Sequence, residues 1–484
     1  MRQQRGQRRL VEVAPAQRQH PEVQLVAVVA VALAEGGQQD GLREDGRHDG
    51  PGGERGWRVP GRAHRGSCCR TRASCRTRPR SGYRRRGLVW RAVRVLLLSW
   101  EYPPLVVGGL GRHVQALARE LAAAGHDVRV VTRGEAPAAT DETVDGVRVR
   151  RAARDPLALD FTTESLLAWS QAAEHALLRA ALPLLRRWHP DVIHAHDWLV
   201  AQSAITLARH TGAALVTTIH ATETGRGMGW LPRPLNLAIH SVERWLVTGS
   251  QAVIICSAAM RDEVVTLFDA PPARVSVIPN GIDVARWRVS AAERAAARQR
   301  AGADPLVVFA GRLVHEKGVQ TLLDAVRPLR AEWGRLRVAI AGTGPYEAQL
   351  RARARRLRIA RAVDWTGFVP DAELAGLLGA ADVVVVPSLY EPFGLVALEA
   401  AAARAPVVVA DTGGLHDLVT GGVAAASFAP GDAGALTVAV ASVLRDPQGA
   451  ARRARAAGSV LRRDYAWAAV ARHTAQVYGR AARR

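Results

Sequence analysis

The sequence predicts an α/β protein built from two Rossmann-like, doubly wound domains. The chain has 484 residues, which is more than one ordinary hydrophobic core accommodates. From residue 92 onward, short runs of Val, Ile and Leu alternate with segments of helix length, a pattern typical of parallel sheets covered on both faces. A turn-rich segment at 279–287 divides this pattern into two series. We therefore expect one domain over 92–285 and a second over 286–464.

The expected elements follow from these apolar runs and from the turn residues between them. Strands of the first series are predicted at 94–100, 126–132, 146–152, 191–196, 213–220, 251–257 and 274–280. Strands of the second series are predicted at 305–312, 335–342, 362–368, 381–388 and 405–411. Intervening segments such as 111–124, 162–187, 198–210 and 235–248 have the length of helices, and a last helix over 465–484 is expected to pack back towards the first domain. In such sheets the ligand lies beyond the carboxyl ends of the strands, so the loops there are the candidate site.

Residues 1–91 differ from the rest of the chain in composition. They hold 20 Arg and 8 acidic residues, so more than half of the net charge of +22 falls in this segment. We interpret it as an Arg-rich extension, either disordered or the product of a start codon placed too early. A basic surface of this kind also suits nucleic acid. However, the chain has 65 Arg and a single Lys, which favours a general drift towards arginine, and no nucleic-acid partner is predicted.

The cysteine count and the lengths of the apolar runs indicate the cellular compartment of the protein. Three of the four Cys lie in the N-terminal extension and only Cys256 lies beyond it, which fits neither a disulfide framework nor a zinc cluster. No apolar run reaches the 18 residues of a membrane span. We expect a cytoplasmic protein, with peripheral membrane contact through the arginine-rich segment 351–361 as an alternative.

A glycine-rich loop follows the first predicted strand. Gly108, Gly109 and Gly111 lie where a strand passes into a helix, so backbone amides there can approach an anion closely. A tight strand-to-helix turn would use the same glycines. The G-x-G-x-x-G pattern of dinucleotide-binding proteins is absent, which argues against NAD or FAD.

Two polar loops follow later strands of the same domain, His-Ala-His-Asp-Trp at 194–198 and Thr-Ile-His-Ala-Thr-Glu at 218–223. Polar groups at one sheet edge favour a pocket there. We expect His194 and His196 to point to opposite faces of their strand, which disfavours a metal site. Each of these histidines is equally compatible with a structural role.

The second domain carries the strongest signals. Arg312 and Lys317, the only lysine, lie in the loop after its first strand, where two cations at a helix start would bind a diphosphate without a metal. Glu391 and Glu399 form an E-x₇-E pattern, which as a continuous helix would span about 12 Å, comparable with the reach from a sugar to a ribose. Between them, the backbone amides of Phe393, Gly394 and Leu395 would lie at a helix start.

In these motifs the chain resembles glycosyltransferase family 4, the retaining family with the GT-B fold. The resemblance extends over about residues 92–480 and is carried by SWEYPP with GGLG, HAHDW, TIHATE, PNGID, GRLVHEKG, AGTGP and YEPFG with E-x₇-E. The wording of several motifs is most similar to the glycogen-synthase-like branch. The stretch 106–110, Val-Val-Gly-Gly-Leu, lacks the lysine that bacterial glycogen synthases of family 5 carry before the paired glycines, so family 4 is favoured and a donor of ADP-glucose is left open.

The resemblance implies roles for individual positions. Arg312 and Lys317 would stabilise the leaving diphosphate, Glu391 would contact the transferred sugar and Glu399 would hold the ribose. His220 would lie near the sugar C6 hydroxyl and the reacting centre. The remaining implied contacts are with donor phosphate (Gly109, Gly111), the base (Gly342, Gly344, Phe368) and the acceptor (Asp197, Trp198).

The expected activity is the retaining, metal-independent transfer of a hexose, with glucose favoured, from an ADP- or UDP-sugar to an acceptor hydroxyl. No metal site and no cofactor beyond the nucleotide sugar are expected; the chain has no D-x-D sequence. The acceptor is expected to be an α-glucan or glucose 1-phosphate. Alternatives are transfer of mannose or another hexose to a lipid or small molecule, or a sugar phosphorylase or epimerase on the same fold.

Overall fold

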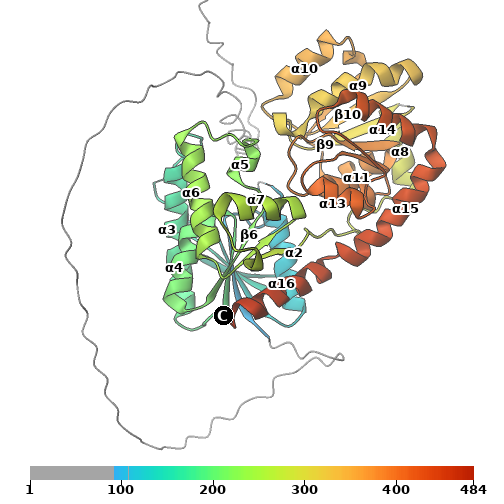
Figure 1. Cartoon of the computed structure of the whole chain (residues 1–484). Helices are drawn as coiled ribbons and strands as arrows, with labels where there is room; N and C mark the ends of the chain where they lie inside the picture. The colour runs from blue at the N-terminus through green and yellow to red at the C-terminus, as the bar shows by residue number, and fades with distance from the viewer. Residues whose placement is uncertain (1–91, 107, 158, 303, 484) are drawn as a thin grey trace, which may run out of the picture. The chain divides into compact units, whose positions relative to one another are not determined.

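The structure, a computed structural model, describes residues 92–106, 108–157, 159–302 and 304–483. The Arg-rich segment 1–91, which we expected to be an extension, lies outside these residues. Within the described part, the chain forms two parallel or mostly parallel sheets, each covered by helices (Figure 1).

The first sheet has the strand order β3-β4-β2-β1-β5-β6-β7-β8. All neighbouring pairs are parallel except β3 and β4. The sequence did not predict β3, because its residues Thr-Asp-Glu-Thr-Val are polar and mostly exposed at the sheet edge. The strands are β1 (Arg94–Ser99), β2 (Asp127–Thr132), β3 (Thr140–Val144), β4 (Val147–Arg151), β5 (Val192–His196), β6 (Ala214–Ile219), β7 (Ala252–Ile255) and β8 (Val275–Val277).

Helices cover both faces of this sheet (Figure 1). They are α2 (Gly109–Ala123), α3 (Leu166–Leu185), α4 (Ala201–Thr211), α5 (Glu223–Arg226), α6 (Pro234–Gly249) and α7 (Ala258–Phe268), with single 3₁₀ turns η1 (Trp198–Val200) and η2 (Pro272–Arg274). Successive residues of β1 alternate between the two cores: Leu96 and Leu98 pack with residues of α3 and α4, whereas Val95 and Leu97 pack with residues of α2. Burial on both faces explains why β1 reads as a continuous apolar run.

The C-terminal helices are α15 (Pro447–Asp464) and α16 (Trp467–Ala481). Helix α16 packs against α2 and β6 of the first sheet. The Tyr478 side chain is fully buried there, and its hydroxyl lies 2.7 Å from Nδ1 of His194 on β5. Just before α16, the carbonyl of Tyr465 accepts a hydrogen bond from the backbone N–H of Ile282, which lies in the turn-rich segment between the two sheets. The segment expected at 465–484 thus contains a helix that completes the core of the first sheet.

The second sheet has the order β11-β10-β9-β12-β13-β14, and all neighbouring pairs are parallel. Its strands are β9 (Leu306–Ala310), β10 (Arg337–Ala341), β11 (Val363–Gly367), β12 (Val383–Val386), β13 (Val407–Ala410) and β14 (Ala426–Phe428), the last of which the sequence did not predict. The other elements of this region are α8 (Ala291–Ala301), α9 (Val319–Glu332), α10 (Glu347–Arg356), α11 (Asp371–Ala380), α12 (Leu395–Ala402), α13 (Gly414–Thr420) and α14 (Ala433–Arg445), with η3 (His315–Lys317) and η4 (Ala360–Ala362).

Each sheet has a point at which the strand order reverses. In the first sheet β1 lies between β2 and β5, and in the second β9 lies between β10 and β12. Ligands of doubly wound sheets bind outside the carboxyl ends of the strands at such points. The loops after β1, β5, β9 and β12 carry most of the residues that the sequence singled out. The predicted fold class, two doubly wound α/β units, is confirmed.

The helices of the described residues fall short of the requirements of a membrane span. None of them is both long enough and apolar enough to cross a bilayer.

Candidate active site

The glycine-rich loop between β1 and α2 is held by a buried carboxylate. The side chain of Glu101 accepts hydrogen bonds from the backbone N–H groups of Gly108 and Gly111, each at 3.0 Å. The next glycine faces the second half of the chain, since a Cβ added to Gly109 would lie 3.0 Å from Cδ1 of Leu395, the first residue of α12. The loop after β1 and the loop after β12 therefore meet closely, and a side chain at position 109 would press on that contact.

Replacing Glu101 with Ala tests this support. We expect the free energy of unfolding to fall by about 2 kcal/mol or more, because two amide groups lose their acceptor and Gly111 is buried. Chemical denaturation monitored by circular dichroism measures the change. Glu332→Ala is the control, because its exposed ion pair with Arg445 contributes little. An equal loss of stability in both variants would contradict the role of Glu101.

The two loops of the second sheet pack against each other and bring a cation onto a carboxylate. Gly318 has a φ of 69°, and a Cβ there would lie 1.8 Å from the carbonyl oxygen of Pro387. This close approach places Lys317 Nζ 2.7 Å from Oε2 of Glu391, which also accepts from the Ser388 hydroxyl at 3.1 Å. The side chains of Lys317 and Glu391 are 21% and 12% exposed, so the pair is largely shielded from water and still open to a ligand.

A second cation of the β9 loop is Arg312, whose side chain is 46% exposed. The Nη2 atom of Arg312 lies 4.0 Å from Oε1 of Glu316. Its pKa is lowered by burial and by the positive charge of Arg226, against the opposing effect of Glu316. The positive charges of Arg312 and Arg226 act on each other, and with Lys317 in the same loop as Arg312 they favour the binding of a multivalent anion.

Arg226 is a residue that the sequence reasoning missed. It ends the short helix α5, and Nη1 lies 3.6 Å from Oε2 of Glu223. Burial lowers the pKa of Arg226, but the carboxylates of Glu223, Asp197 and Glu243 outweigh it and raise that pKa. The only signal in the sequence is a single cation a few residues after His220, directly behind the Thr-Glu-Thr-Gly segment at 222–225.

The E-x₇-E pattern is not one continuous helix. Helix α12 begins at Leu395, because Gly394 adopts a left-handed conformation with φ of 102° and precedes its first turn. Glu391 therefore lies in the loop, and only Glu399 lies on the helix. The separation of about 12 Å between Glu391 and Glu399, which assumes a continuous helix, therefore does not apply.

Glu399 lies in a different electrostatic environment from Glu391. Burial, helped by the negative charge of Asp371, raises the pKa of Glu399 to about 7, and Arg112 and Arg286 oppose this. Both arginines pair with Asp371, Arg112 through Nη1 at 3.0 Å from its carboxylate. Arg112 belongs to α2, so the glycine-rich side of the first half also reaches this carboxylate.

The pKa of Glu399 gives a pH-dependent stability. Between the ordinary pKa of 4.5 and about 7, the unfolded chain is ionised at this position while the folded chain keeps the proton, so stability falls as pH rises through this window. We expect Glu399→Gln, which cannot ionise, to gain stability relative to the wild-type protein as pH rises from about 5 to 8. Denaturation at several pH values measures the difference, with the exposed Glu373→Gln as control. A difference that does not vary with pH would refute the prediction.

His220 follows β6 and is tied to the loop after β5. Its backbone N–H donates to Oδ1 of Asp197 at 2.7 Å, and Asp197 itself has a φ of 61°. Burial raises the pKa of Asp197 to about 6, whereas Arg226 and this hydrogen bond lower it. Burial and the charge of Arg226 lower the pKa of His220 to about 4. His220 is therefore a neutral imidazole near pH 7, able to hydrogen-bond a hydroxyl.

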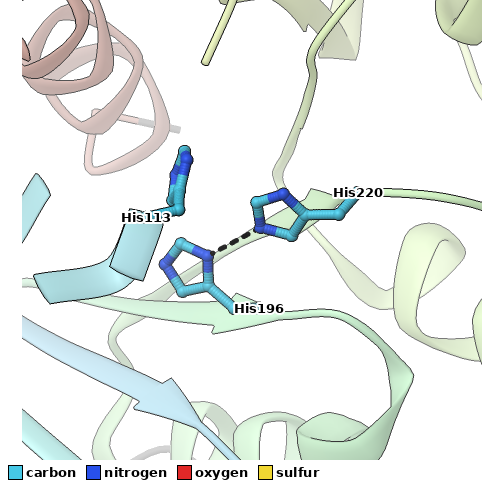
Figure 2. Close-up of side chains that lie close together, drawn as sticks. All are labelled: His113, His196 and His220. Atoms are coloured by element: carbon cyan, nitrogen blue, oxygen red, sulfur yellow. Dashed lines mark hydrogen bonds between the residues drawn. The ribbon is translucent and has the colours of Figure 1, made fainter. Parts of the chain in front are cut away.

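The histidines of β5 correct one expectation. The rings of His194 and His196 have centroids 4.2 Å apart and lie on the same face of the strand, because residues two positions apart share a face. Our expectation of opposite faces was wrong, and the argument against a metal built on it does not hold. His196 Nδ1 lies 3.3 Å from His220 Nε2, and His113 of α2 completes a cluster with them (Figure 2).

The other residues assigned to the acceptor and the base occupy distinct environments. Trp198 is 8% exposed and packs among Leu166, Leu199 and Ile239, which leaves little of its surface for an acceptor. Phe368 is 70% exposed after β11, two strands away from β9.

Gly342 and Gly344 allow the loops after β9 and β10 to touch. A Cβ at Gly342 would lie 1.8 Å from the carbonyl oxygen of Gly311, and one at Gly344 would lie 2.3 Å from that of Leu313. Phe393 is 4% exposed, so its ring belongs to the core and its backbone is the part beside the helix start. Gly342 and Gly344 thus allow the loop after β10 to pack against the loop that carries Arg312.

A further contact between the halves lies beside Glu391. The Tyr390 hydroxyl donates to Oε1 of Glu263 on α7 at 3.3 Å, and the Thr222 hydroxyl donates to the same oxygen. A Cβ at Gly225 would lie 2.2 Å from the Tyr390 hydroxyl oxygen. The segment that carries Glu391 is therefore in contact with the loop that carries His220. Sequence reasoning missed this contact, because Glu263 is an ordinary glutamate within a helix.

Both halves of the chain match models of glycosyltransferase families. Residues 107–286 match the family model described as Glycosyltransferase Family 4, and residues 292–459 match that of glycosyl transferases group 1. A glycogen synthase of Mycobacterium tuberculosis (strain CDC 1551 / Oshkosh) is 48% identical over 397 residues, which cover 80% of this chain and 94% of that protein.

Solved structures share the fold. Sucrose-phosphate synthase from Thermosynechococcus elongatus matches with a TM-score of 0.68 at 24% identity, covering 81% of this chain and 99% of that one. The catalytic domain of starch synthase IV from Arabidopsis thaliana, bound to ADP and acarbose, matches with a TM-score of 0.66 at 20% identity, covering 81% and 100%. The protein is a glycosyltransferase with the GT-B fold. It belongs to glycosyltransferase family 4.

Proposed function

We propose that the protein transfers a hexose, with glucose favoured, from a nucleoside diphosphate sugar to an acceptor hydroxyl, with retention of configuration and without a catalytic metal. The observation that carries the proposal is the contact of Lys317 with Glu391 between two packed loops. Arg312 lies in the same loop as Lys317, and its pKa is influenced by the positive charge of Arg226. Such a set of charges matches a diphosphate bearing a sugar, because the cations suit the phosphates and the carboxylate suits sugar hydroxyls.

The proposed chemistry begins with departure of the nucleoside diphosphate. Lys317 and Arg312 stabilise the negative charge that develops on it, and they are already in place before the bond breaks. The acceptor hydroxyl attacks the same face of the sugar, the new bond forms at the anomeric carbon, and the departing phosphate takes the hydroxyl proton. Neutral His220 hydrogen-bonds the sugar, and Glu399 binds the ribose diol, for which it must lose its proton.

The proposed donor is ADP- or UDP-glucose, and no other cofactor is proposed. Support comes from the relative named glycogen synthase and from the structural neighbour that was solved with ADP and acarbose. The proposed acceptor is an α-glucan, which the name of the glycogen synthase relative supports, or glucose 1-phosphate. We place the reaction in the cytoplasm, on the ground that residues 92–484 hold a single, buried cysteine and so no possible disulfide of their own.

The test is a matrix of donors and acceptors. ADP-, UDP- and GDP-glucose and GDP-mannose are each incubated with maltooligosaccharides or glucose 1-phosphate, and released nucleoside diphosphate is measured together with the anomeric configuration of the product by NMR. We expect release that depends on the acceptor, an α-linked product from an α-linked donor, and no loss of activity with a chelator. Release without any acceptor, or a β-linked product, would overturn the proposal.

A further inference from the structure

Three histidines from different elements bring their rings together at the carboxyl edge of the first sheet. His113 lies on α2, His196 ends β5, and His220 follows β6 (Figure 2). Strands β5 and β6 are parallel neighbours with His196 opposite Thr218, so His220 emerges just beyond it. Ring centroids lie 4.7 Å apart for His113 and His220, and 5.6 Å apart for the other two pairs.

The nitrogen atoms are spaced as metal ligands are. One nitrogen from each ring can be chosen so that all three lie within 4.8 Å of one another. The closest pair, His196 Nδ1 and His220 Nε2, is 3.3 Å apart. Two nitrogens at the usual zinc distance of about 2.0–2.1 Å in tetrahedral geometry are separated by about 3.3–3.4 Å. The His196–His220 pair thus has the spacing that two ligands of one ion require, and an ion there would replace the hydrogen bond between them. The third nitrogen lies within 4.8 Å and would have to move closer.

Hydrogen bonding within the protein uses these rings only in part: His196 Nδ1 pairs with His220 Nε2, and His113 has a side-chain hydrogen bond with Asn280. Among the described residues, His113 Nδ1 and His196 Nε2 are buried and have no hydrogen-bond partner. His196 is 0% exposed and His113 is 9% exposed, so water does not readily replace the missing partners. By contrast, the neighbouring His194 is satisfied at both nitrogens, by the hydroxyls of Tyr478 and Thr218. A fully satisfied histidine beside two partly satisfied ones indicates that the cluster is suited to a further ligand.

The charge state of the cluster favours a metal ion that forms coordinate bonds with nitrogen lone pairs. It does not favour a cation that is held only by negative charge. Burial lowers the pKa of His113, His196 and His220. Neighbouring imidazoles add to this effect for His113 and His196, and the charge of Arg226 adds to it for His220, so all three rings are neutral and present lone pairs. The carboxylate nearest to them in the loop, Asp197, is occupied by the backbone N–H of His220. Three neutral imidazoles with an open fourth position are a ligand set that zinc-type ions prefer.

We propose that His113, His196 and His220 form a binding site for one divalent transition-metal ion of the zinc type. The site goes beyond the proposed transfer reaction, which uses no metal. An ion there would bind a ring nitrogen of His220 and take that ring away from the sugar. Metal binding at the cluster is therefore inhibitory, and this consequence alone rests on the proposed function.

The test measures binding separately from activity. The full chain, freed of any polyhistidine tag and of metal, is titrated with Co²⁺, and the visible absorption of the bound ion is recorded; Zn²⁺ is then added as a competitor. We expect one Co²⁺ per chain with a spectrum of nitrogen ligation, displaced by Zn²⁺. Cysteines at 68, 69 and 75 would instead give sulfur-to-cobalt charge-transfer bands in the near ultraviolet.

Variants assign the site. We expect His113→Ala and His196→Gln each to weaken Co²⁺ binding at least about 100-fold. Loss of a residue that only hydrogen-bonds to a metal ligand already costs up to about 100-fold in affinity, and loss of the ligand itself costs no less. The exposed His210→Ala on α4 is the matched control and should bind as the wild-type protein does. If His196→Gln fails to fold, His113→Ala decides, because its ring is nearer the surface. Unchanged affinity in His113→Ala, or no nitrogen-ligated Co²⁺ in the wild-type protein, would overturn the proposal.

The activity assay then separates the two claims. Stoichiometric Zn²⁺ should inhibit sugar transfer in the wild-type protein, and a chelator should restore it. Binding without inhibition would leave the metal site intact and contradict the role of His220 in transfer. Inhibition without binding at the cluster would contradict the metal site and leave the transfer proposal standing.

Discussion

Lys317→Ala is expected to lower kcat/KM for sugar transfer by about 10²–10³-fold, the range seen when one preorganised donor to a developing charge is removed. The loss should fall mainly on kcat, because the ammonium group acts on charge that appears as the diphosphate leaves. Nζ of Lys317 lies 2.7 Å from Glu391, so the same change also leaves that carboxylate without its cation. Steady-state kinetics with the donor and acceptor found in the matrix assay measure both constants.

The control for this variant is a cation of the same region with no contact to the loop chemistry. Arg327 is exposed on α9, the helix that the Lys317 loop leads into, and Arg327→Ala should transfer sugar normally. Lys317→Arg keeps the charge but changes its shape and reach, so it should recover only part of the activity. Near-normal turnover in Lys317→Ala, with the protein folded by circular dichroism, would refute the assigned role.

Glu391→Gln is expected to lower kcat/KM by about 10²-fold or more. Some stability is lost as well, because Lys317 keeps its charge in a largely shielded place without its partner. The amide keeps the size of the side chain and can still accept from Ser388, but it removes the negative charge that faces Lys317. The matched control is Glu373→Gln, an exposed position on α11. Kinetics under the same conditions as for Lys317→Ala allow a direct comparison.

The double variant sharpens both predictions. Because Lys317 and Glu391 are in contact, their effects should not add, and the double variant should lose far less than the product of the two single losses. Fully multiplicative losses would show that the two side chains act independently, against the arrangement proposed for them.

The architecture could be predicted from sequence because its strands are buried on both faces. Continuous runs such as Val383–Val386 leave one interpretation, and the strands of the structure begin and end within a few residues of the predicted limits. The misses have physical reasons. β3 is polar because it lies at an exposed edge, and α5 has four residues, too few for any periodicity.

The site was only partly predictable for a different reason. Lys317 and Glu391 lie in loops whose place at the sheet edge follows from the strand order, so their encounter could be anticipated. Arg226 and Glu263 join the site through contacts between segments far apart in sequence, and nothing in their local sequence marks them. The histidine cluster was not predicted, because His194 and His196 were expected to point to opposite faces of β5, whereas residues two positions apart share a face.

The packing of α16 on the first sheet has a consequence for how the chain is made. Tyr478, six residues from the C-terminus, fills a place beside His194 that nothing synthesised earlier occupies. At 5–20 residues per second, the ribosome needs roughly 10–40 s to travel the about 200 residues from the end of β8 to this tyrosine. The N-terminal half of the nascent protein thus waits, with part of its interior uncovered, until Tyr478 has been synthesised and α16 can pack.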